Sequence, residues 1–255
     1  IGGSVQANLG GEAAVMNIFG SYNGGGNLSI TGSININEGG NGTKQVNIYG
    51  PPANNTLGGK LTIGGSISVL DTGNGISGLR IDDGVTIGGN VAYDNSANTA
   101  NGDNVQIYSN SNAYGVTAIA GTLTLALSQA TYQGNTVRLQ GFGTPLTVTG
   151  AVKVTSGGGA DNLELANVWF KSTTTLNTGS NPSFVRDLLG IDGSRFDLAA
   201  AFTMSGAYAQ LNLGTNSSFV PTYFNNTFAA TVNGASALVL LSNATSTTNQ
   251  VVFIS

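Results

Sequence analysis

The side chains of this sequence best suited to chemistry are aspartates that stand beside glycine and asparagine. Asp71, Asp82, Asp83, Asp94 and Asp103 follow one another within a short stretch of the chain. Calcium binds carboxylate and carbonyl oxygens, which turns of this composition supply. These residues are therefore calcium candidates, and no other cofactor is indicated. Ordinary turn chemistry, in which Asp and Asn side chains hydrogen-bond the nearby backbone, explains the same residues without a metal.

The residue types on which most enzymes rely are missing. The 255-residue chain has no cysteine and no histidine, and only 8% of its residues are charged, against about 25% in average proteins. A disulfide framework, thiolate chemistry, a Cys/His zinc site and a histidine base are therefore excluded. The formal net charge of −4 also lacks the basic footprint of a nucleic-acid-binding protein. We expect no catalytic residues and no nucleic-acid partner.

An all-β enzyme could still cleave polysaccharide with carboxylates, or with acids and bases, clustered on one face. The relevant residues are the middle positions of a recurring apolar-x-apolar motif: Asn17, Asn47, Arg80, Gln106, Arg138 and Glu164. In stacked β-coils, Arg80 and Arg138 would lie about 10 Å apart with Gln106 between them. A solvated ladder of mixed side chains explains this column better than a catalytic centre does.

An internal repeat with a period of about 29 residues determines where these residues lie in the fold. The repeated unit alternates apolar residues around a central glycine, as in LSITGSINI at 28–36, LTIGGSISV at 61–69, VTIGGNVAY at 85–93, TAIAGTLTL at 117–125 and LTVTGAVKV at 146–154. Alternation with a period of two indicates strands with one buried face. A single unit cannot bury that face, whereas stacked units build one continuous core. The sequence therefore predicts an all-β protein, a parallel β-helix (β-solenoid) with coils of about 29 residues.

The central glycine of each unit indicates a corner. Glycine inside a strand usually marks a tight bend or a close approach of another backbone. We expect the chain to turn there from one face of the coil to the next. The predicted corner glycines are Gly3, Gly32, Gly65, Gly89, Gly121 and Gly150.

The regularity weakens after about residue 167. Eight of the ten phenylalanines and the single tryptophan, Trp169, lie in 168–255. We divide the chain into solenoid repeats at 1–167 and irregular coils at 168–255, which form a C-terminal cap or a second β domain. The segment SFVRDLLG at 183–190 predicts one short helix, with Ser183 as N-cap and Gly190 as its stop.

The Gly/Asn/Thr-rich repeats of 1–167 resemble the β-solenoid repeats of bacterial surface and secreted proteins. Filamentous-haemagglutinin-type adhesins and autotransporter passengers are the nearest types. This resemblance implies a scaffold, an adhesin or an extracellular polymer at the cell surface. The segment GGGADNLEL at 157–165 also resembles the calcium-binding nonapeptide of RTX repeats. That second resemblance adds Asp161 to the calcium candidates.

The two ends of the sequence favour self-assembly. Ile1 begins halfway through a glycine-centred unit, with Val5 in its second half, and the far end reads Val251 to Ser255 in an apolar strand. An open solenoid end invites strand pairing, and contacts that do not close on themselves produce filaments. We name Ile1, Val5, Val251 and Phe253 as assembly ends. An excised piece of a longer solenoid explains the same ends.

The function expected from these features is that of a non-enzymatic extracellular structural protein that assembles with itself into a filament, sheath or surface layer. The alternatives are an adhesin or carbohydrate-binding surface module, with glycans as partners, and a polysaccharide-degrading β-helix enzyme. No apolar run approaches the roughly 18 residues of a transmembrane helix, so no membrane span is expected.

Overall fold

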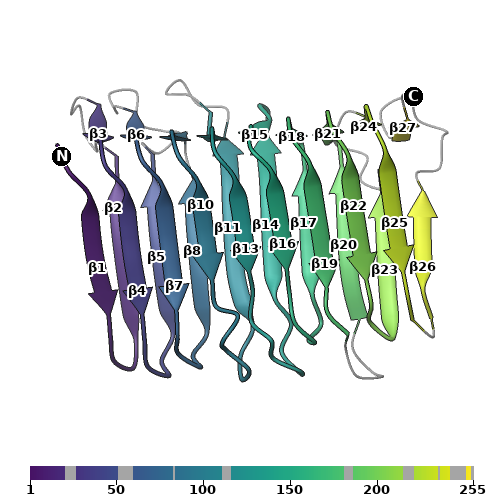
Figure 1. Ribbon diagram of the computed structural model, residues 1–255, viewed down its shortest axis with the longest axis horizontal. Helices are drawn as coiled ribbons and strands as arrows, with labels where there is room; N and C mark the ends of the chain where they lie inside the picture. Colours follow the sequence, from purple (N-terminus) through teal and green to yellow (C-terminus); the bar gives the residue numbers. More distant parts are fainter. Residues whose placement is uncertain are drawn as a thin grey trace.

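The protein is a β-solenoid of three parallel sheets with nine strands each (Figure 1). The computed structural model describes residues 1–255 except 21–26, 51–59, 83, 111–115, 181–185, 215–220, 235, 242–250 and 254–255. The described ranges contain no helix, and hence none long and apolar enough to cross a membrane. We call the three sheets A, B and C. Each coil contributes one strand to each sheet, always in the same order.

The strands follow the chain from sheet A to sheet B to sheet C and then back to A in the next coil. Sheet A consists of β1 (Val5–Leu9), β4 (Ile34–Glu38), β7 (Ile67–Asp71), β10 (Val91–Asp94), β13 (Leu123–Ala126), β16 (Val152–Thr155), β19 (Thr174–Thr178), β22 (Ala200–Met204) and β25 (Phe228–Val232). Sheet B consists of β2 (Ala14–Phe19), β5 (Lys44–Tyr49), β8 (Ser77–Asp82), β11 (Asp103–Asn110), β14 (Thr136–Phe142), β17 (Asn162–Ala166), β20 (Arg186–Asp192), β23 (Tyr208–Leu213) and β26 (Leu238–Leu241). Sheet C consists of β3 (Leu28–Ile30), β6 (Leu61–Ile63), β9 (Val85–Ile87), β12 (Ala118–Ile119), β15 (Leu146–Val148), β18 (Val168–Phe170), β21 (Arg195–Phe196), β24 (Thr222–Phe224) and β27 (Val251–Phe253).

The register of the parallel strands confirms the repeat read from the sequence. Ile34 pairs with Ile67, and Ile67 pairs with Val91, as the aligned units predict. From Val5 to Phe228, the register steps of sheet A give a mean coil of about 28 residues, within the usual range of solenoid repeats. The predicted parallel β-helix is therefore confirmed, with coils close to the length expected from the sequence.

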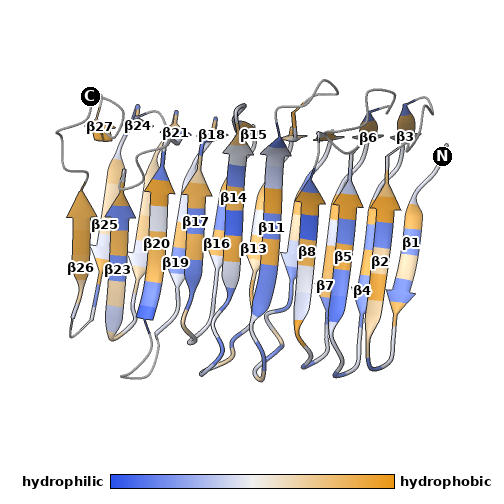
Figure 2. Ribbon diagram, turned by 180° about the vertical axis from the view of Figure 1, so that it is seen from behind, coloured by the Kyte–Doolittle hydropathy of each residue, from blue (hydrophilic) through white to orange (hydrophobic). Residues whose placement is uncertain are grey.

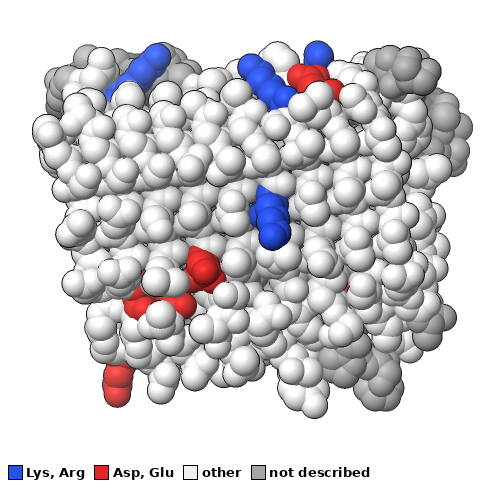
Figure 3. Space-filling view, in the orientation of Figure 1, with Lys and Arg blue, Asp and Glu red and all other residues white. Residues whose placement is uncertain are grey.

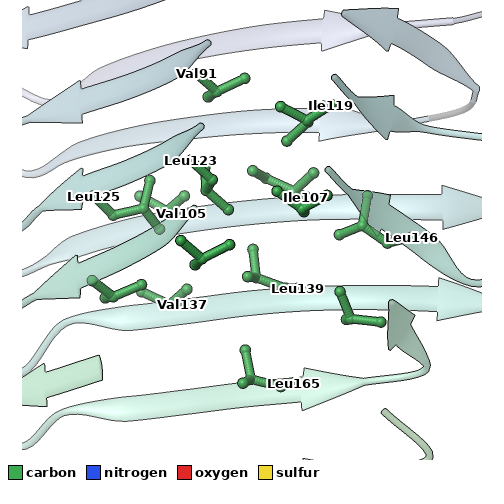
Figure 4. Close-up of a cluster of buried hydrophobic side chains, with 14 of the residues drawn as sticks. Val91, Val105, Ile107, Ile119, Leu123, Leu125, Val137, Leu139, Leu146 and Leu165 are labelled. Carbon is green, nitrogen blue, oxygen red and sulfur yellow. The ribbon is translucent and has the colours of Figure 1, made fainter. Parts of the chain in front are cut away.

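Alternation along each strand separates the core from the surface (Figure 2). Outward positions are mostly small or polar, and Figure 3 shows one face on which few side chains are charged. Inward positions are aliphatic and meet between the sheets, as Val91 of sheet A, Ile107 of sheet B and Ile119 of sheet C do (Figure 4). All three are fully buried. Burial of each such side chain stabilises the fold by about 1.5–3 kcal/mol.

The predicted short helix at 183–190 is wrong. Residues 186–190 belong to strand β20, while Ser183 lies outside the described residues. Leu189 and Ile191 are buried and pair with Leu163 and Leu165 of β17. The local pattern of the segment suited a helix, but pairing with the preceding coil buries its apolar residues with a period of two, and that tertiary gain decides the conformation.

The three sheets continue past residue 167, and the inward column of sheet C becomes aromatic there. The aliphatic side chains at Ile119 and Val148 are followed by a stack of phenylalanines. Neighbouring rings of this stack lie 4.8, 4.8 and 5.3 Å apart between centroids. Its members are Phe170, Phe196, Phe224 and Phe253. These four phenylalanines thus fill the interior of the same solenoid.

Candidate functional site

The predicted corner glycines stack on one another at the bend between sheets C and A. The N–H of Gly65 donates to the carbonyl of Gly32 at 3.1 Å, and the N–H of Gly89 donates to that of Gly65 at 3.0 Å. A Cβ atom on Gly89 would lie 2.8 Å from the carbonyl carbon of Gly65 and 2.5 Å from Ser66 Oγ. Glycine is required at this position because the backbone of the preceding coil fills the space of a side chain, whereas a Cβ atom on Gly3, in the first coil, would meet nothing within 4 Å. The other members of the stack are Gly3, Gly121 and Gly150.

The mixed polar column predicted for sheet B lies on its outer face. Gln106 pairs with Arg80 on one side and with Arg138 on the other. Arg80 forms an ion pair with Asp82 at 2.8 Å, and Arg138 forms one with Glu164 at 3.4 Å. Both arginine side chains are about two-fifths exposed. The column is therefore a solvated ladder in which each arginine already faces an acid.

A neighbouring outward stripe of sheet B is aromatic. The rings of Phe19 and Tyr49 stack with centroids 5.4 Å apart and planes 15° apart. The guanidinium of Arg80 lies 5.4 Å from the ring centroid of Tyr49 and 5.6 Å from that of Tyr108. Phe142 packs on Tyr108 at 5.7 Å. The planes of Tyr108 and Phe142 are tilted by 54°, so face-to-face stacking in this stripe is limited to Phe19 and Tyr49.

The structure separates the calcium candidates. Asp71 and Asp103 are buried in consecutive coils at the bend between sheets A and B. Asp82 lies at the opposite end of its sheet B strand, and Asp161 lies two coils away from Asp103. Asp83 is outside the described residues. Among the residues that the structure describes, no three acidic, cysteine or histidine side chains are grouped so that they could hold a metal ion.

Buried charges share the bend between sheets A and B. Lys44 Nζ lies 3.7 Å from Asp71 Oδ1, and both side chains are fully buried. Lys44 Nζ also donates to the carbonyl of Gly40 at 2.9 Å. At the same bend, Ser77 Oγ donates to Glu38 Oε2 at 2.7 Å. Burial raises the pKa of Glu38. Each of these buried groups thus has an internal partner, although Glu38 Oε1 and Asp71 Oδ2 accept no hydrogen bond from the residues that the structure describes.

Further along the same bend, side-chain oxygens link successive coils. Asn135 Oδ1 accepts the N–H of Asp103 at 2.9 Å, Asp161 Oδ1 accepts the N–H of Asn135 at 3.0 Å, and Asp187 Oδ1 accepts the N–H of Asp161 at 3.0 Å. Burial raises the pKa of Asp103 to about 7. Burial also raises the pKa of Asp161 to about 6. Two of the calcium candidates thus take part in hydrogen bonding that holds the coils together.

The predicted assembly ends lie at opposite ends of the solenoid axis (Figure 1). Ile1 lies beside the first described coil, where its ammonium group donates to the carbonyl of Ser29 at 2.8 Å. Its side chain is 63% exposed. Val5 is half-buried in edge strand β1. At the other end, edge strand β27 holds half-buried Val251 and Phe253, whose side chain is 54% exposed.

The six edge strands carry neither of two features that often protect a sheet edge, charged residues and prolines. Strands β1, β2 and β3 at one end and β25, β26 and β27 at the other contain no charged residue and no proline. All four residues of β26, Leu238–Leu241, are apolar and exposed (Figure 2). Natural sheets normally blunt such edges with charges, prolines or bulges because bare edges pair with other chains. Both ends of the described solenoid are therefore suited to pairing.

A hollow of about 170 Å³ opens on the outer side of sheet C. Trp169, Arg195 and Tyr223 follow one another in one outward column of this sheet. They line the hollow together with Pro145 and Pro221. Since most of the lining is apolar and the guanidinium of Arg195 stands among it, the hollow combines a flat apolar surface with a cation.

Asp197 fixes the polar groups of this hollow. Its Oδ2 accepts a hydrogen bond from Trp169 Nε1 at 2.7 Å, and its Oδ1 accepts from Arg195 Nε at 2.6 Å and from Asn225 Nδ2 at 2.9 Å. Burial alone would raise the pKa of Asp197, but these hydrogen bonds outweigh it and lower that pKa. Lys171 Nζ and Arg195 Cζ lie 4.2 and 5.0 Å from the ring centroid of Trp169. Two cations are thus held against one indole ring.

Sequence reasoning missed this hollow. Trp169 was visible as the single tryptophan, but its neighbours Arg195 and Tyr223 come from coils whose repeat could not be aligned. No family model, curated protein or solved structure is significantly similar to the chain.

Proposed function

We propose that the protein is a non-enzymatic structural protein whose copies assemble end to end through the edge strands of the solenoid. The observation that carries this proposal is that the edge strands at both ends are uncharged and leave apolar inward residues partly uncovered. A second copy supplies a matching surface. Val5 of that copy would continue the column that ends at Phe228, just as Ile34 continues it from Val5 within the chain.

The pleat of the strands restricts how two copies join. A slip of one residue would turn every apolar side chain of an edge strand away from the core, so the in-register arrangement is favoured. The two contacting surfaces are different, because the β1 end of one copy meets the β25 end of the next. A contact of this heterologous kind that does not close into a ring produces a filament.

An extracellular setting suits this assembly. The chain relies on Ser, Thr, Asn and Gly rather than on charge, since only 8% of its residues are charged. Its repeats resemble those of bacterial surface proteins such as filamentous-haemagglutinin-type adhesins and autotransporter passengers. We therefore place the proposed filament, sheath or surface layer at the cell surface.

Sedimentation velocity over a range of concentrations, together with negative-stain electron microscopy, tests the assembly. We expect rods whose length grows with concentration while their width stays that of one solenoid. Val239→Lys puts a charge on exposed edge strand β26 and should shorten the rods. Leu70→Lys changes a similarly exposed residue on the side of the solenoid and serves as the control. A discrete monomer at every concentration, or equal effects of the two variants, would contradict the proposal.

A second candidate function is that of an adhesin or carbohydrate-binding surface module, and the hollow beside Trp169 favours it. Apolar, aromatic-lined hollows with a few placed polar groups are the usual form of small-ligand sites. Polysaccharide cleavage is less favoured. Glycoside hydrolysis uses a pair of carboxyl groups, whereas the outward column of sheet B offers Glu164, which is already paired with Arg138.

A further inference from the structure

We propose that the hollow beside Trp169 binds a carboxylated sugar ring, as in the uronate units of an acidic polysaccharide. This inference rests on the second candidate function and names its substrate class. It does not depend on end-to-end assembly, because the hollow lies on the side of the solenoid, on sheet C. Three features carry it: the apolar lining, the orientation of Arg195 and the size of the hollow.

The lining suits the face of a sugar ring. Trp169 and Tyr223 flank Arg195 in the same outward column, and Pro145 and Pro221 add further apolar surface. The face of an aromatic ring carries negative charge density. The C–H bonds on the face of a pyranose ring carry partial positive charge and pack against such a surface.

Arg195 is held in a position to bind a carboxylate. Asp197 engages its Nε, whereas the two Nη groups make no hydrogen bond to any residue that the structure describes. The side chain is 51% exposed and contributes to the lining of the hollow. A guanidinium binds a carboxylate through two parallel hydrogen bonds. Lys171 adds a second cation, so the three charged groups around Trp169 sum to +1 although the chain carries −4.

The size of the hollow suits a single sugar ring that belongs to a longer ligand. Its volume of about 170 Å³ is below the roughly 300–1,000 Å³ of pockets that enclose whole drug-sized molecules. Since the hollow is open to solvent, the rest of a polysaccharide chain could continue along the surface. A nucleic acid would need a continuous basic track, which a chain with 8 basic and 12 acidic residues does not provide.

Trp169 makes the binding directly measurable, because it is the single tryptophan of the chain. The purified protein is titrated with oligomers of galacturonate, glucuronate and mannuronate, and with uncharged galactose, glucose and mannose oligomers of the same lengths. We expect at least one uronate oligomer to change the Trp169 fluorescence saturably, with a Kd roughly tenfold or more below that of its neutral counterpart. Isothermal titration calorimetry should give the same Kd.

Two arginine variants locate the binding. Arg195→Gln should weaken uronate binding by roughly 10- to 100-fold, because it removes charge-assisted hydrogen bonds. Arg138→Gln removes an arginine of similar exposure from sheet B and should leave the Kd unchanged. Circular dichroism melting checks that both variants remain folded.

Each remaining outcome overturns a defined part of the inference. Equal binding of uronate and neutral oligomers would refute the role of the carboxylate but keep carbohydrate binding. No saturable binding of any oligomer would refute both. Equal competition by inorganic phosphate would show a general anion site instead of a sugar site, and an unchanged Kd in Arg195→Gln would place the binding elsewhere.

Discussion

The rings of Phe196 and Phe224 lie nearly parallel, with planes 6° apart and centroids 4.8 Å apart. This distance matches the spacing of about 4.7–4.9 Å between neighbouring strands of a sheet. Identical side chains at one position of successive coils are therefore brought to stacking distance by the backbone itself. The aromatic column extends the solenoid core through its C-terminal coils without any change of architecture.

Shortening Phe196 should destabilise the C-terminal coils. The side chain is fully buried between Phe170 and Phe224, so Phe196→Ala leaves a cavity and should lower the free energy of unfolding by about 3–5 kcal/mol. Urea unfolding measures this loss, and hydrogen exchange should show it first in β20 to β24. Phe142→Ala, at a ring that is 44% exposed, is the control and should cost much less. Equal losses in the two variants would show that the stack adds little.

The stacked corner glycines predict a strong contrast between two glycine substitutions. Gly89→Ala places a Cβ atom 2.8 Å from the backbone of Gly65 and should lower the melting temperature, and Gly89→Val should lower it further. In Gly190→Ala, the nearest atom to the new Cβ is the carbonyl oxygen of Leu163 at 4.0 Å, so that variant should melt near the wild type. Thermal unfolding followed by circular dichroism compares them. A wild-type melting temperature for Gly89→Val would show that the corner tolerates a side chain.

The fold was predictable wherever the coils repeat the same residue types. The alignment of Ile34, Ile67 and Val91 in the sequence is the register of sheet A, and the corner glycines from Gly3 to Gly150 followed from the same alignment. Alternation with a period of two is a local property of the chain, so it can be recognised in a short stretch of sequence. The stacking of coils then follows from the need to bury one face of every strand.

The hollow beside Trp169 could not be predicted from the sequence, and the reason is physical. In sheet A, the coil that runs from Val152 to its partner Thr174 is shorter than the coil from Leu123 to Val152 before it. The sheet C column changes from Val148 to Phe170 at the same point. Without a constant spacing, the sequence does not tell which residue of the next coil lies beside Trp169. The segment that became β20 shows the same difficulty, because its helical pattern was overridden by pairing with β17.

Acidic pH should stabilise the protein. Asp103 and Asp161 bind a proton more tightly in the folded state, where their pKa values rise to about 7 and about 6, than in the unfolded chain, where an aspartate has a pKa of about 3.9. Their contribution is present in full below the unfolded pKa and is lost as the pH rises through the folded values. Each group can therefore remove up to roughly 1.4 kcal/mol of stability per pH unit, Asp103 between about pH 4 and pH 7 and Asp161 between about pH 4 and pH 6.

Urea unfolding at pH 4.5, 6 and 8 measures this dependence. The midpoint should fall as the pH rises, and Asp103→Asn should flatten the fall between pH 6 and pH 8. Asp94→Asn changes an exposed aspartate near the same bend and should leave the slope as it is. A midpoint that rises from pH 4.5 to pH 8 would contradict the assignment.

Breaking the buried ion pair of Lys44 and Asp71 should destabilise the protein. Lys44→Met keeps most of the side-chain volume but removes the ammonium that lies 3.7 Å from Asp71. The carboxylate is then left buried without its counter-ion, and loss of one partner of such a pair costs about 3–5 kcal/mol. Urea unfolding at pH 7 should show a loss of this size.

The double variant Lys44→Met/Asp71→Asn separates the missing charge from the missing side-chain contacts. Asp71 Oδ1 accepts the N–H of Gly73 at 2.8 Å in the wild type. The amide oxygen introduced by Asp71→Asn can still accept this N–H, and the buried negative charge is gone. The double variant should therefore be more stable than Lys44→Met alone at pH 7. If the two variants unfold at the same urea concentration, the loss comes from the hydrogen bonds that Lys44 donates to Gly40 and Gly42 and not from the unpaired carboxylate.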